Sequence, residues 1–341
     1  MSTPDGPRPA RPAQVALGHS GVRVTQMMFG AAPIAGLFAP VSEQAARATL
    51  EAAWAAGIRA FDTAPHYGAG LSEQRLGAFL TGQPRRDYVV CTKVGRRLAD
   101  GEELADGAEG FYGAPRRRRF RDYSRDGVLA SLEGSLARLG TDRVDIALIH
   151  DPDDHARQAL DEAYPALAQL RAEGVIGAVG FGMTQAPLLE WFVARADLDC
   201  VLIAGRYSLL DTGAGESLLP ACRERGVAVL AGGVFNSGVL VDPRPGRTFE
   251  YQPAPAEILQ RALRLKAVCA EYGLPLGAVA LRFVLRHPAV TAAVVGARSP
   301  AEVAEDAGYL AAQVPDELWA RLAAVGLLPA DTGAVGSEAG S

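Results

Sequence analysis

The sequence has few of the features that mark secreted, membrane-bound or metal-binding proteins. Its four cysteines are widely separated and form no CxxC or metal-ligand spacing: Cys91, Cys200, Cys222 and Cys269. Buried free thiols in a reducing compartment are therefore expected, rather than disulfides or a metal site. No apolar run approaches the length of a membrane span, and the proline-rich residues 1–14 lack the apolar core of a secretion signal. We expect a cytoplasmic protein with no membrane partner and no metal.

The chain also has no excess of positive charge and very few lysines. The formal charge of −5 gives the chain no general attraction to nucleic acid. Lys93 and Lys266 are the only lysines among 34 basic residues, so arginine serves wherever a positive charge only needs solvent. Lys93 lies inside the apolar run VVCTKV, which suggests a site that needs a compact ammonium group. What the chain does have is 49% apolar residues, enough to form a sizeable core.

A regular alternation of short apolar runs and helical patterns organises the chain. Eight runs predict strands, at 27–30, 58–61, 88–92, 144–149, 176–181, 200–204, 227–231 and 291–295. Helical patterns lie between and after them, at 42–56, 72–80, 124–139, 160–172, 186–195, 216–225, 256–271, 276–286 and 300–311. This order predicts an α/β fold of the (β/α)8 TIM-barrel type. A doubly wound sheet would need GxGxxG after its first strand, but Gly68-Ala69-Gly70 follows the second and lacks the third glycine.

The pattern also predicts how the barrel begins and ends. Residues 15–328 are expected to form one barrel domain, with disordered segments at 1–14 and 329–341. Runs 15–17 and 22–24 predict a small hairpin that closes the bottom of the barrel. In the pattern at 256–271, apolar residues recur at helical spacing and are expected to face the barrel: Ile258, Ala262, Leu265 and Cys269.

Two connections are too long to be simple links between a strand and the next helix. Residues 95–123 and 234–255 are expected to be lids or substrate walls on the face where the strands end. The first contains the basic run Arg116–Arg119, which we interpret as a solvated loop in preference to an anion site.

Four polar residues stand at or just beyond the ends of successive strands: Asp62, Tyr67, Lys93 and His150. Such ends meet on one face of a parallel barrel, where active sites form. Hydride transfer to or from a carbonyl carbon needs a partner for the proton on its oxygen, and a nearby ammonium lowers the pKa of a tyrosine toward that task. Lys93 would supply the ammonium, Asp62 would keep it charged and Tyr67 would exchange the proton. His150 would orient the substrate oxygen.

Each of these residues has a plainer alternative taken alone. Asp62 could cap a turn, Tyr67 could be a loop aromatic, and Lys93 could pair with a surface carboxylate. His150 could satisfy a backbone carbonyl, and the neighbouring His66 and His155 are expected to be pocket or surface residues. Their joint occurrence at neighbouring strand ends favours the catalytic interpretation.

The segment after the last strand suggests a phosphate site. Ser299, Pro300 and Glu302 form a capping box with proline at the first helical position, so this is a helix start in any case. A helix N-terminus after the last barrel strand is also where this fold often holds phosphate, and Arg298 is placed to take part. We favour both interpretations together.

These motifs resemble the aldo-keto reductase superfamily over about residues 15–325. The match lies in FDTAPHYG, CTKVG and IHDPD, which carry Asp62, Tyr67, Lys93 and His150 in the order and context of that family's catalytic tetrad. DYSRDGVLASLEGSLARLGTDRVDIALIHDPDD, AGRYSLLD and GGVFNSGVL are most similar to the bacterial branch with aldose 1-dehydrogenases, L-fucose dehydrogenase and pyridoxal 4-dehydrogenase. The resemblance implies NAD(P) bound in an extended form across the barrel mouth.

The resemblance further implies which residues contact the cofactor: Gly30, Asp62, Gly182, Asn236, Gly296, Arg298, Ser299, Glu305 and Asp306. The sequence departs from the family at several of them. Gly182-Met183 stands where a Ser-Asn pair commonly holds the carboxamide, and Ala204 lies near a frequent glutamine. Gly232 lies near the usual stacking aromatic, with Phe235 and Asn236 close by. Glu302 adds an acid that argues against a strong demand for the 2′-phosphate of NADP, whereas Arg298 argues for tolerating one.

The resemblance implies a small carbonyl or alcohol substrate. The first hypothesis is oxidation of an aldose hemiacetal to a lactone, with Tyr67 as the general base. The alternative is reduction of an aldehyde or ketone in a biosynthetic pathway. A regulatory subunit that binds the cofactor without turnover, and a metal-dependent barrel hydrolase, are weaker alternatives. The sequence leaves the substrate, the direction, the choice between NAD and NADP, and the oligomeric state open.

Overall fold

The structure is a computed structural model, and it describes residues 11–100, 105–250 and 252–329. The predicted disorder at 1–10 and 330–341 lies outside the described residues. Residues 11–14 are described, and the N-terminal hairpin begins at Gln14, one residue earlier than expected.

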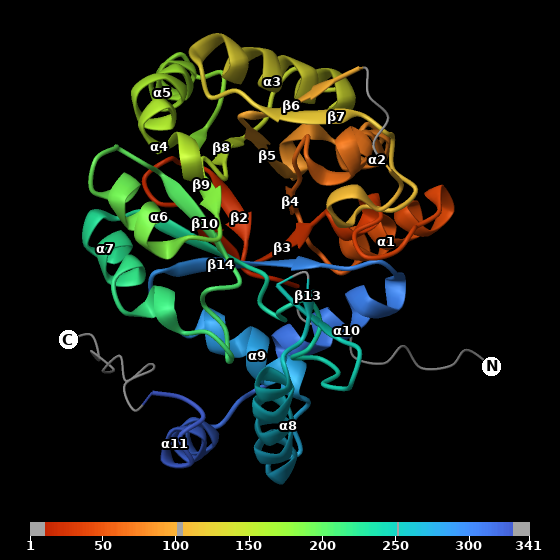
Figure 1. Cartoon of the computed structure of the whole chain (residues 1–341), viewed down its shortest axis with the longest axis vertical. Helices are drawn as coiled ribbons and strands as arrows, with labels where there is room; N and C mark the ends of the chain where they lie inside the picture. The colour runs from red at the N-terminus through yellow and green to blue at the C-terminus, as the bar shows by residue number, and fades with distance from the viewer. Residues whose placement is uncertain (1–10, 101–104, 251, 330–341) are drawn as a thin grey trace.

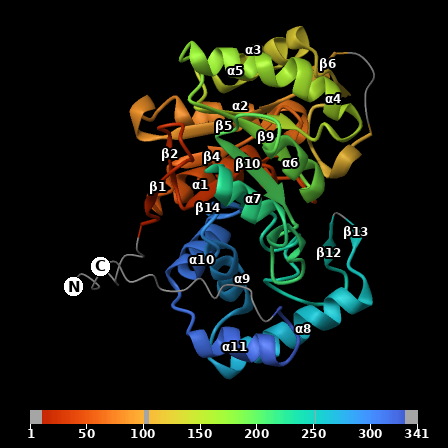
Figure 2. The same ribbon diagram turned by 90° about the vertical axis from the view of Figure 1, so that its left-hand side faces the viewer.

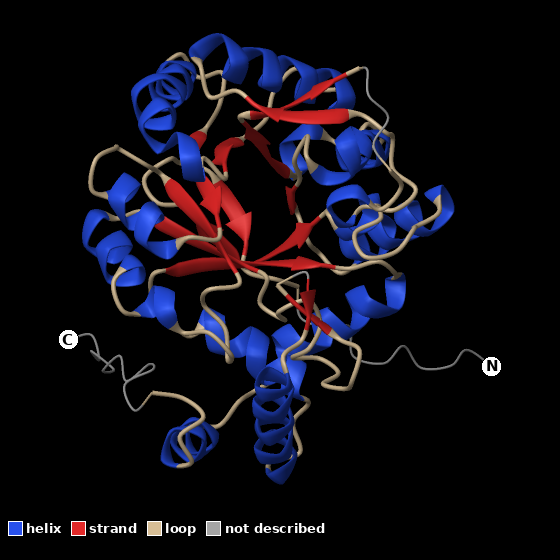
Figure 3. Cartoon of the chain, in the orientation of Figure 1, coloured by secondary structure: helices blue, strands red, loops and turns tan. Residues whose placement is uncertain are grey.

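Eight parallel strands close into a barrel at the centre of the molecule, with helices around it (Figures 1 and 3). Around the barrel the strands follow the order β10-β11-β14-β3-β4-β5-β8-β9, so that β14 pairs with β3 and closes it. Their bounds are β3 Met27–Gly30, β4 Ala60–Asp62, β5 Val89–Val94, β8 Ile146–His150, β9 Ala178–Met183, β10 Cys200–Ala204, β11 Ala228–Gly232 and β14 Val290–Gly296. The (β/α)8 prediction is confirmed, and each strand overlaps the apolar run that predicted it.

Most of the helices cover the outside of the barrel, because they present an apolar stripe to the strands. They are α1 Glu43–Ala55, α2 Leu71–Leu80, α3 Arg125–Leu139, α4 Ala156–Gln158, α5 Tyr164–Ala172, α6 Ala186–Val193, α7 Leu218–Arg225, α8 Ala256–Glu271, α9 Leu276–Leu285, α10 Pro300–Ala311 and α11 Asp316–Ala324. Local signals set several of their ends: the Ser42 and Ser124 side chains accept hydrogen bonds from backbone amides in the first turns of α1 and α3. Gly140, with φ of 64°, ends α3.

A two-stranded hairpin closes the bottom of the barrel, as predicted. Its strands are β1 Gln14–Ala16 and β2 Arg23–Thr25, and they lie at the end opposite the long loops (Figure 2). Leu17 and Val24 are fully buried in one apolar cluster with the inward-facing residues of the barrel, which include Met28, Cys91 and Cys200. The barrel interior is therefore a packed core, and in such a barrel the active site forms at the open mouth.

One packing prediction needs correction. The apolar stripe of α8 packs against α9 and α11, and it is α9 that lies on the barrel strand β14. In Figures 1 and 2, α8 and α11 lie outside the ring of barrel helices. Helical spacing identified the buried face correctly, since Leu265 and Cys269 are fully buried. It carried no information on which element covers that face.

The two long connections fold into hairpins on the face where the barrel strands end. In the first, β6 Arg96–Ala99 pairs with β7 Arg118–Arg121, and in the second, β12 Thr248–Phe249 pairs with β13 Gln252–Pro253. The first connection also docks on the loop after β3, through a bridge between Leu37 and Phe111. It thus forms a side wall over the barrel mouth.

Among the described residues, no single helix is long and apolar enough to cross a membrane. Only α8 and α9 taken together pass that test, and they are bent by 95° at the break between them.

Candidate active site

The four residues of the predicted tetrad lie together at the mouth of the barrel. Asp62 ends β4, Lys93 lies near the end of β5 and His150 ends β8, and these three strands are neighbours in the barrel. Their side chains therefore come from adjacent strand ends. Tyr67 follows β4 by five residues and begins a tight turn that brings its ring over the mouth.

Lys93 is the centre of this group. Its ammonium nitrogen Nζ donates to both carboxylate oxygens of Asp62, at 2.7 and 2.8 Å, and to the hydroxyl of Tyr67 at 3.0 Å. A further bond at 3.0 Å goes to the backbone oxygen of Thr63. The Lys93 and Asp62 side chains are 1% and 3% exposed, so both charges are paired inside the protein. Such a pair is held rigidly because each partner satisfies the other.

The electrostatics keep this lysine charged. Burial alone would lower the pKa of Lys93, but the Asp62 carboxylate and Tyr67 oppose that effect and raise the pKa above its ordinary value. Tyr67 is half-buried and its hydroxyl is the end of the chain of bonds that faces the cavity. The arrangement can therefore present a phenol hydroxyl next to a permanent positive charge.

The turn that carries Tyr67 depends on glycine. Gly68 and Gly70 adopt φ of 58° and 92°, and Ala69 between them has φ of 50°. A Cβ on Gly68 would lie 2.7 Å from the backbone oxygen of Ala35, so no side chain fits there without movement. The close approach fixes the Tyr67 ring, which stacks on Phe111 with ring centroids 6.2 Å apart.

His150 is buried and uncharged. Burial, followed by the charges of Arg96 and Lys93, lowers the pKa of His150 well below its ordinary value. Its Nδ1 is buried without a hydrogen-bond partner, whereas Nε2 lies 3.5 Å from the Asp151 carboxylate. We assign the single ring hydrogen to Nε2, because a hydrogen on Nδ1 would be a buried donor without a partner and would leave the lone pair of Nε2 facing the Asp151 carboxylate. Nε2 is then a donor available to a substrate oxygen.

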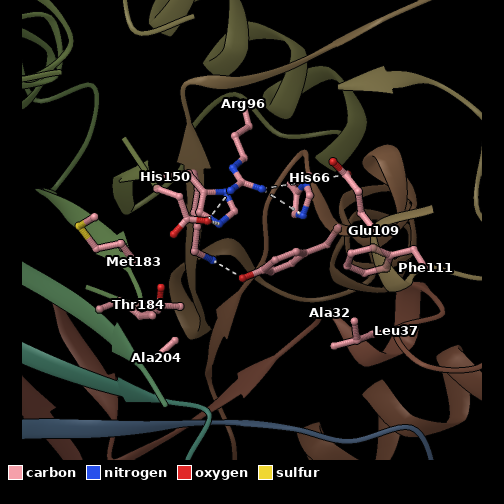
Figure 4. Close-up of a pocket in the computed structure, with 15 residues that line it drawn as sticks. Ala32, Leu37, His66, Arg96, Glu109, Phe111, His150, Met183, Thr184 and Ala204 are labelled. Atoms are coloured by element: carbon pink, nitrogen blue, oxygen red, sulfur yellow. Dashed lines mark hydrogen bonds and ion pairs between the residues drawn. The ribbon is translucent and has the colours of Figure 1, made fainter. Parts of the chain in front are cut away.

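A cavity of about 260 Å³ lies over these groups, and its two sides differ in chemistry. In Figure 4, Arg96, His66 and Glu109 lie on one side, and Met183, Thr184 and Ala204 on the other. Small or apolar residues line the rest of the cavity: Ala32, Leu37, Phe111, Gly182 and Leu202. The cavity thus has a polar wall at Arg96, His66 and Glu109, and a mostly apolar wall at Met183, Thr184 and Ala204.

The polar wall contains two charged residues at the cavity that sequence reasoning did not assign to the site, Arg96 and Asp151. Arg96 and Asp151 form an ion pair at 2.8 Å, and Arg96 also lies 3.2 Å from the Nε2 of His66. Burial and then Arg96 lower the pKa of His66 to about 3, so its ring is neutral. His66 was expected to be a pocket or surface residue, and it lines the pocket. The position of Arg96, three residues after Lys93, was the available signal for a further polar group at the same strand end.

The basic run at Arg116–Arg119 is only partly solvated. Arg116 and Arg118 are exposed, as expected, but the Arg119 side chain is 6% exposed and pairs with Glu109 at 2.6 Å. Glu109 in turn lies 3.5 Å from the Nδ1 of His66. Arg119 therefore supports the polar wall from behind.

The residues expected to contact the cofactor form a band that leads from the cavity to α10. Gly296, Gly30 and Asp62 are in register at the ends of β14, β3 and β4. Gly182 lies in β9 and lines the cavity. A Cβ on Gly296 would lie 2.7 Å from the ring of Pro33, so this close packing requires glycine.

Farther out, Arg298 and Ser299 begin α10. Ser299 Oγ accepts from the Glu302 amide at 3.2 Å, which confirms the serine half of the predicted capping box. The Glu302 carboxylate accepts from the Arg298 amide at 2.7 Å, one residue before the N-cap amide that a capping box would use. The Arg298 guanidinium lies 3.4 Å from Glu302 and is partly neutralised by it. Glu305 and Asp306 follow about 9–10 Å along the helix. Burial and the neighbouring acids Glu302 and Glu305 raise the pKa of Asp306 to about 8.

The residues present fit an extended dinucleotide. Asn236, in the loop after β11, is buried with φ of 45°, and its amide nitrogen lies 3.4 Å from the backbone oxygen of Gly205. Its amide oxygen has no partner, so a donor from a ligand would satisfy it. Gly182 and Ala204 leave room for a flat ring against the apolar wall. Phe235, close by in the sequence, packs edge-to-face on Tyr309 of α10 with ring centroids 6.0 Å apart.

The described residues contain no group of three or more histidine, cysteine or acidic side chains placed to hold a metal ion. The four cysteines are free and buried.

Comparison with known proteins agrees with this geometry. The family model described as "Aldo/keto reductase family" matches residues 26–326. The chain is 43% identical to D-threo-aldose 1-dehydrogenase from a Pseudomonas species, over 92% of this chain and 98% of that protein. It is 41% identical to pyridoxal 4-dehydrogenase from Microbacterium luteolum, over 92% and 97%. Among solved structures, an aldo-keto reductase from Bacillus halodurans in its holo form matches with a TM-score of 0.74 and 25% identity, covering 92% of this chain and 96% of that one.

Proposed function

The chain belongs to the aldo/keto reductase family and is an NAD(P)-dependent oxidoreductase, and from this premise we propose that it oxidises an aldose at its anomeric carbon to a lactone. The observation that carries the proposal is the 3.0 Å bond from Lys93 to the Tyr67 hydroxyl at the floor of the cavity. The similarity to an aldose 1-dehydrogenase over nearly the whole chain supports the choice of substrate.

In this proposal Tyr67 is the general base. Its oxygen, in the phenolate form, would take the proton of the anomeric hydroxyl while C1 gives up its hydride. The positive charge of Lys93 stabilises the phenolate form that accepts the proton. Asp62 keeps the ammonium charged and in place. His150 donates from Nε2 to the reacting oxygen and orients it, as its buried and neutral state allows.

The cofactor would supply the hydride acceptor when bound. We propose that Gly182 and Asn236 hold its nicotinamide half and that Gly30, Asp62 and Gly296 border it at the strand ends. Arg298 and Ser299 would bind phosphate at the start of α10, where backbone amides favour anions. Glu305 and Asp306 would border the adenine. Because Glu302 partly neutralises Arg298, we expect NAD to be preferred to NADP.

Residues 15–328 would act as one catalytic domain. A cytoplasmic location is supported by the four buried, unpaired thiols, which suit a reducing compartment. We place the substrate among small carbonyl or alcohol compounds, as the family match supports.

Pyridoxal is a second candidate substrate. The chain is 41% identical to a pyridoxal 4-dehydrogenase, and the Tyr67 and Phe111 rings at the cavity offer aromatic surface to a flat ring. Reduction of an aldehyde or ketone by the same groups is the reverse reaction, with Tyr67 as the acid.

The test is a substrate screen with the purified full chain. Aldoses, pyridoxal and simple alcohols are offered with NAD⁺ and NADP⁺, and the absorbance of the reduced nicotinamide is followed. Simple aldehydes with NADH and NADPH form the reverse arm. We expect the highest kcat/KM with an aldose and NAD⁺. Higher kcat/KM with pyridoxal or with aldehyde reduction would replace the aldose proposal, and binding of cofactor with no turnover on any substrate would refute an enzymatic role.

A further inference from the structure

The polar wall of the cavity contains an ion pair that the tetrad does not use. Arg96, the first residue of β6, pairs through Nη2 with the carboxylate of Asp151 at 2.8 Å. Both side chains line the cavity and are only 18% and 21% exposed. We propose that this pair binds the hydroxyl on the carbon next to the anomeric carbon, so that the enzyme selects neutral aldoses with a free 2-hydroxyl. The inference rests on the proposed aldose oxidation and names the feature of the sugar that is recognised.

The ion pair lies next to the atom that is proposed to hold the reacting oxygen. The Asp151 carboxylate lies 3.5 Å from the Nε2 of His150, the atom proposed to hold the reacting oxygen. The next polar groups that a substrate meets beyond that oxygen are therefore Asp151 and Arg96. On an aldose, the hydroxyl at C2 is the neighbour of the one at C1. A carboxylate beside a guanidinium offers that hydroxyl an acceptor for its hydrogen and a donor for its oxygen.

Arg96 has hydrogen-bond donors that its partners in the protein do not use. Arg96 has five N–H donors, of which Nη1 engages His66 and Nη2 engages Asp151. Its Nε is buried away from the cavity. Nη1 and Nη2 each carry two hydrogens, so the guanidinium keeps donors for an incoming oxygen acceptor.

The backbone places the Asp151 side chain at the cavity. Asp151 has φ of 42°, a left-handed conformation that aspartate tolerates better than most residues other than glycine. Its amide donates to the backbone oxygen of Gly182 at 3.0 Å, and the Tyr123 hydroxyl lies 2.6 and 2.7 Å from the backbone oxygens of His150 and Asp151. Tyr123 is fully buried and its ring lies against Gly95, where a Cβ would come within 2.3 Å. These hydrogen bonds hold the Asp151 carboxylate in a fixed position at the cavity.

Charge identifies the substrate class. Each charged group facing the cavity is already paired: Lys93 with Asp62, Arg96 with Asp151, and Glu109 with Arg119. His66 and His150 are neutral in this environment. The cavity therefore has no spare positive charge for a phosphate or carboxylate on the substrate, and it alternates donors and acceptors as a polyol requires.

The experiment compares aldoses with their 2-deoxy counterparts, such as D-galactose with 2-deoxy-D-galactose and L-fucose with 2-deoxy-L-fucose, at saturating NAD⁺. Hydrogen bonds to charged groups contribute enough that we expect the wild type to prefer the parent sugar by roughly 10- to 100-fold in kcat/KM. In Asp151→Asn and Arg96→Met the preference should fall to within about threefold, mainly through loss on the parent sugar.

The chain provides a matched control. Arg121 and Asp154 form a second ion pair between the same two segments at 3.6 Å, but their side chains are 42% and 83% exposed and lie outside the cavity lining. Arg121→Met should keep the wild-type preference for the parent sugar. Retention of NAD⁺ binding by each variant, measured by fluorescence titration, shows that the site is folded.

The outcomes separate this inference from the proposed function. If the wild type oxidises aldoses but treats 2-deoxy sugars equally, or if both pocket variants keep its preference, the inference is overturned and aldose oxidation stands. If the wild type oxidises no aldose, both fall. Should a pocket variant fail to bind NAD⁺, the wild-type comparison of parent and 2-deoxy sugars still decides.

Discussion

The buried pair of Lys93 and Asp62 allows stability and catalysis to be separated by mutation. At an effective dielectric constant of about 20, two unit charges at the observed 2.7 Å attract each other by about 6 kcal/mol. The desolvation free energy of each charge offsets part of this attraction. Removing one partner leaves the other charge buried alone, which costs about 3–5 kcal/mol. Lys93→Met and Asp62→Leu should each lower the free energy of unfolding by that amount.

The double variant is the informative one. With both charges replaced by apolar groups, no buried charge is left uncompensated. The double variant should therefore lose less unfolding free energy than the two single variants together, by about 2 kcal/mol or more. Its turnover should nevertheless be lost, since Tyr67 no longer has an ammonium beside it. Urea unfolding measures the stability and hydride transfer to NAD⁺ measures the activity. Additive stability losses, or turnover near the wild-type rate in Lys93→Met, would refute the reasoning.

Three further results follow from the packing and pKa values. In urea unfolding, Gly95→Ala should destabilise the chain by about 1–3 kcal/mol more than Gly174→Ala. A Cβ at Gly95 would lie 2.3 Å from the Tyr123 ring, whereas nothing lies within 4 Å of a Cβ at Gly174. Equal losses of stability in the two variants would contradict the close contact at Gly95. Asp306→Asn should stabilise the cofactor-free protein more at pH 8 than at pH 5.5, by up to about 3 kcal/mol. The reason is that an acid whose pKa is raised to about 8 on folding destabilises the native state progressively as pH rises to that value. A pH-independent effect in thermal unfolding would show that Asp306 is not buried as described. The pH profile of kcat/KM should show no histidine titration near pH 6.5, because both pocket histidines have lowered pKa values. An inflection near pH 6.5 that disappears in a His66→Asn variant would contradict the lowered pKa of His66.

The tetrad could be predicted from sequence because its signal is local. Short apolar runs end at Asp62, Lys93 and His150, and the parallel barrel brings such ends to one face whatever the loops do. The same rule located the cavity and the start of α10 at Ser299.

The polar wall could not be predicted, because its geometry depends on contacts between distant segments. Arg96 belongs to a hairpin with residues 118–121, a pairing that no local pattern indicates. Asp151 follows the last residue of a strand and resembles an ordinary turn residue until Tyr123, 28 residues earlier, is seen to hold its backbone. The buried Arg119 illustrates the same limit, since it stands in a basic run that composition alone assigns to solvent.

The central claim is that the Tyr67 hydroxyl exchanges the substrate proton. Single-turnover hydride transfer to NAD⁺ in Tyr67→Phe, measured together with NAD⁺ affinity, tests it most directly. The account predicts a cofactor Kd within about threefold of the wild type and a rate lower by about 10²- to 10⁴-fold, the usual contribution of a general base. Hydride transfer at close to the wild-type rate would contradict it.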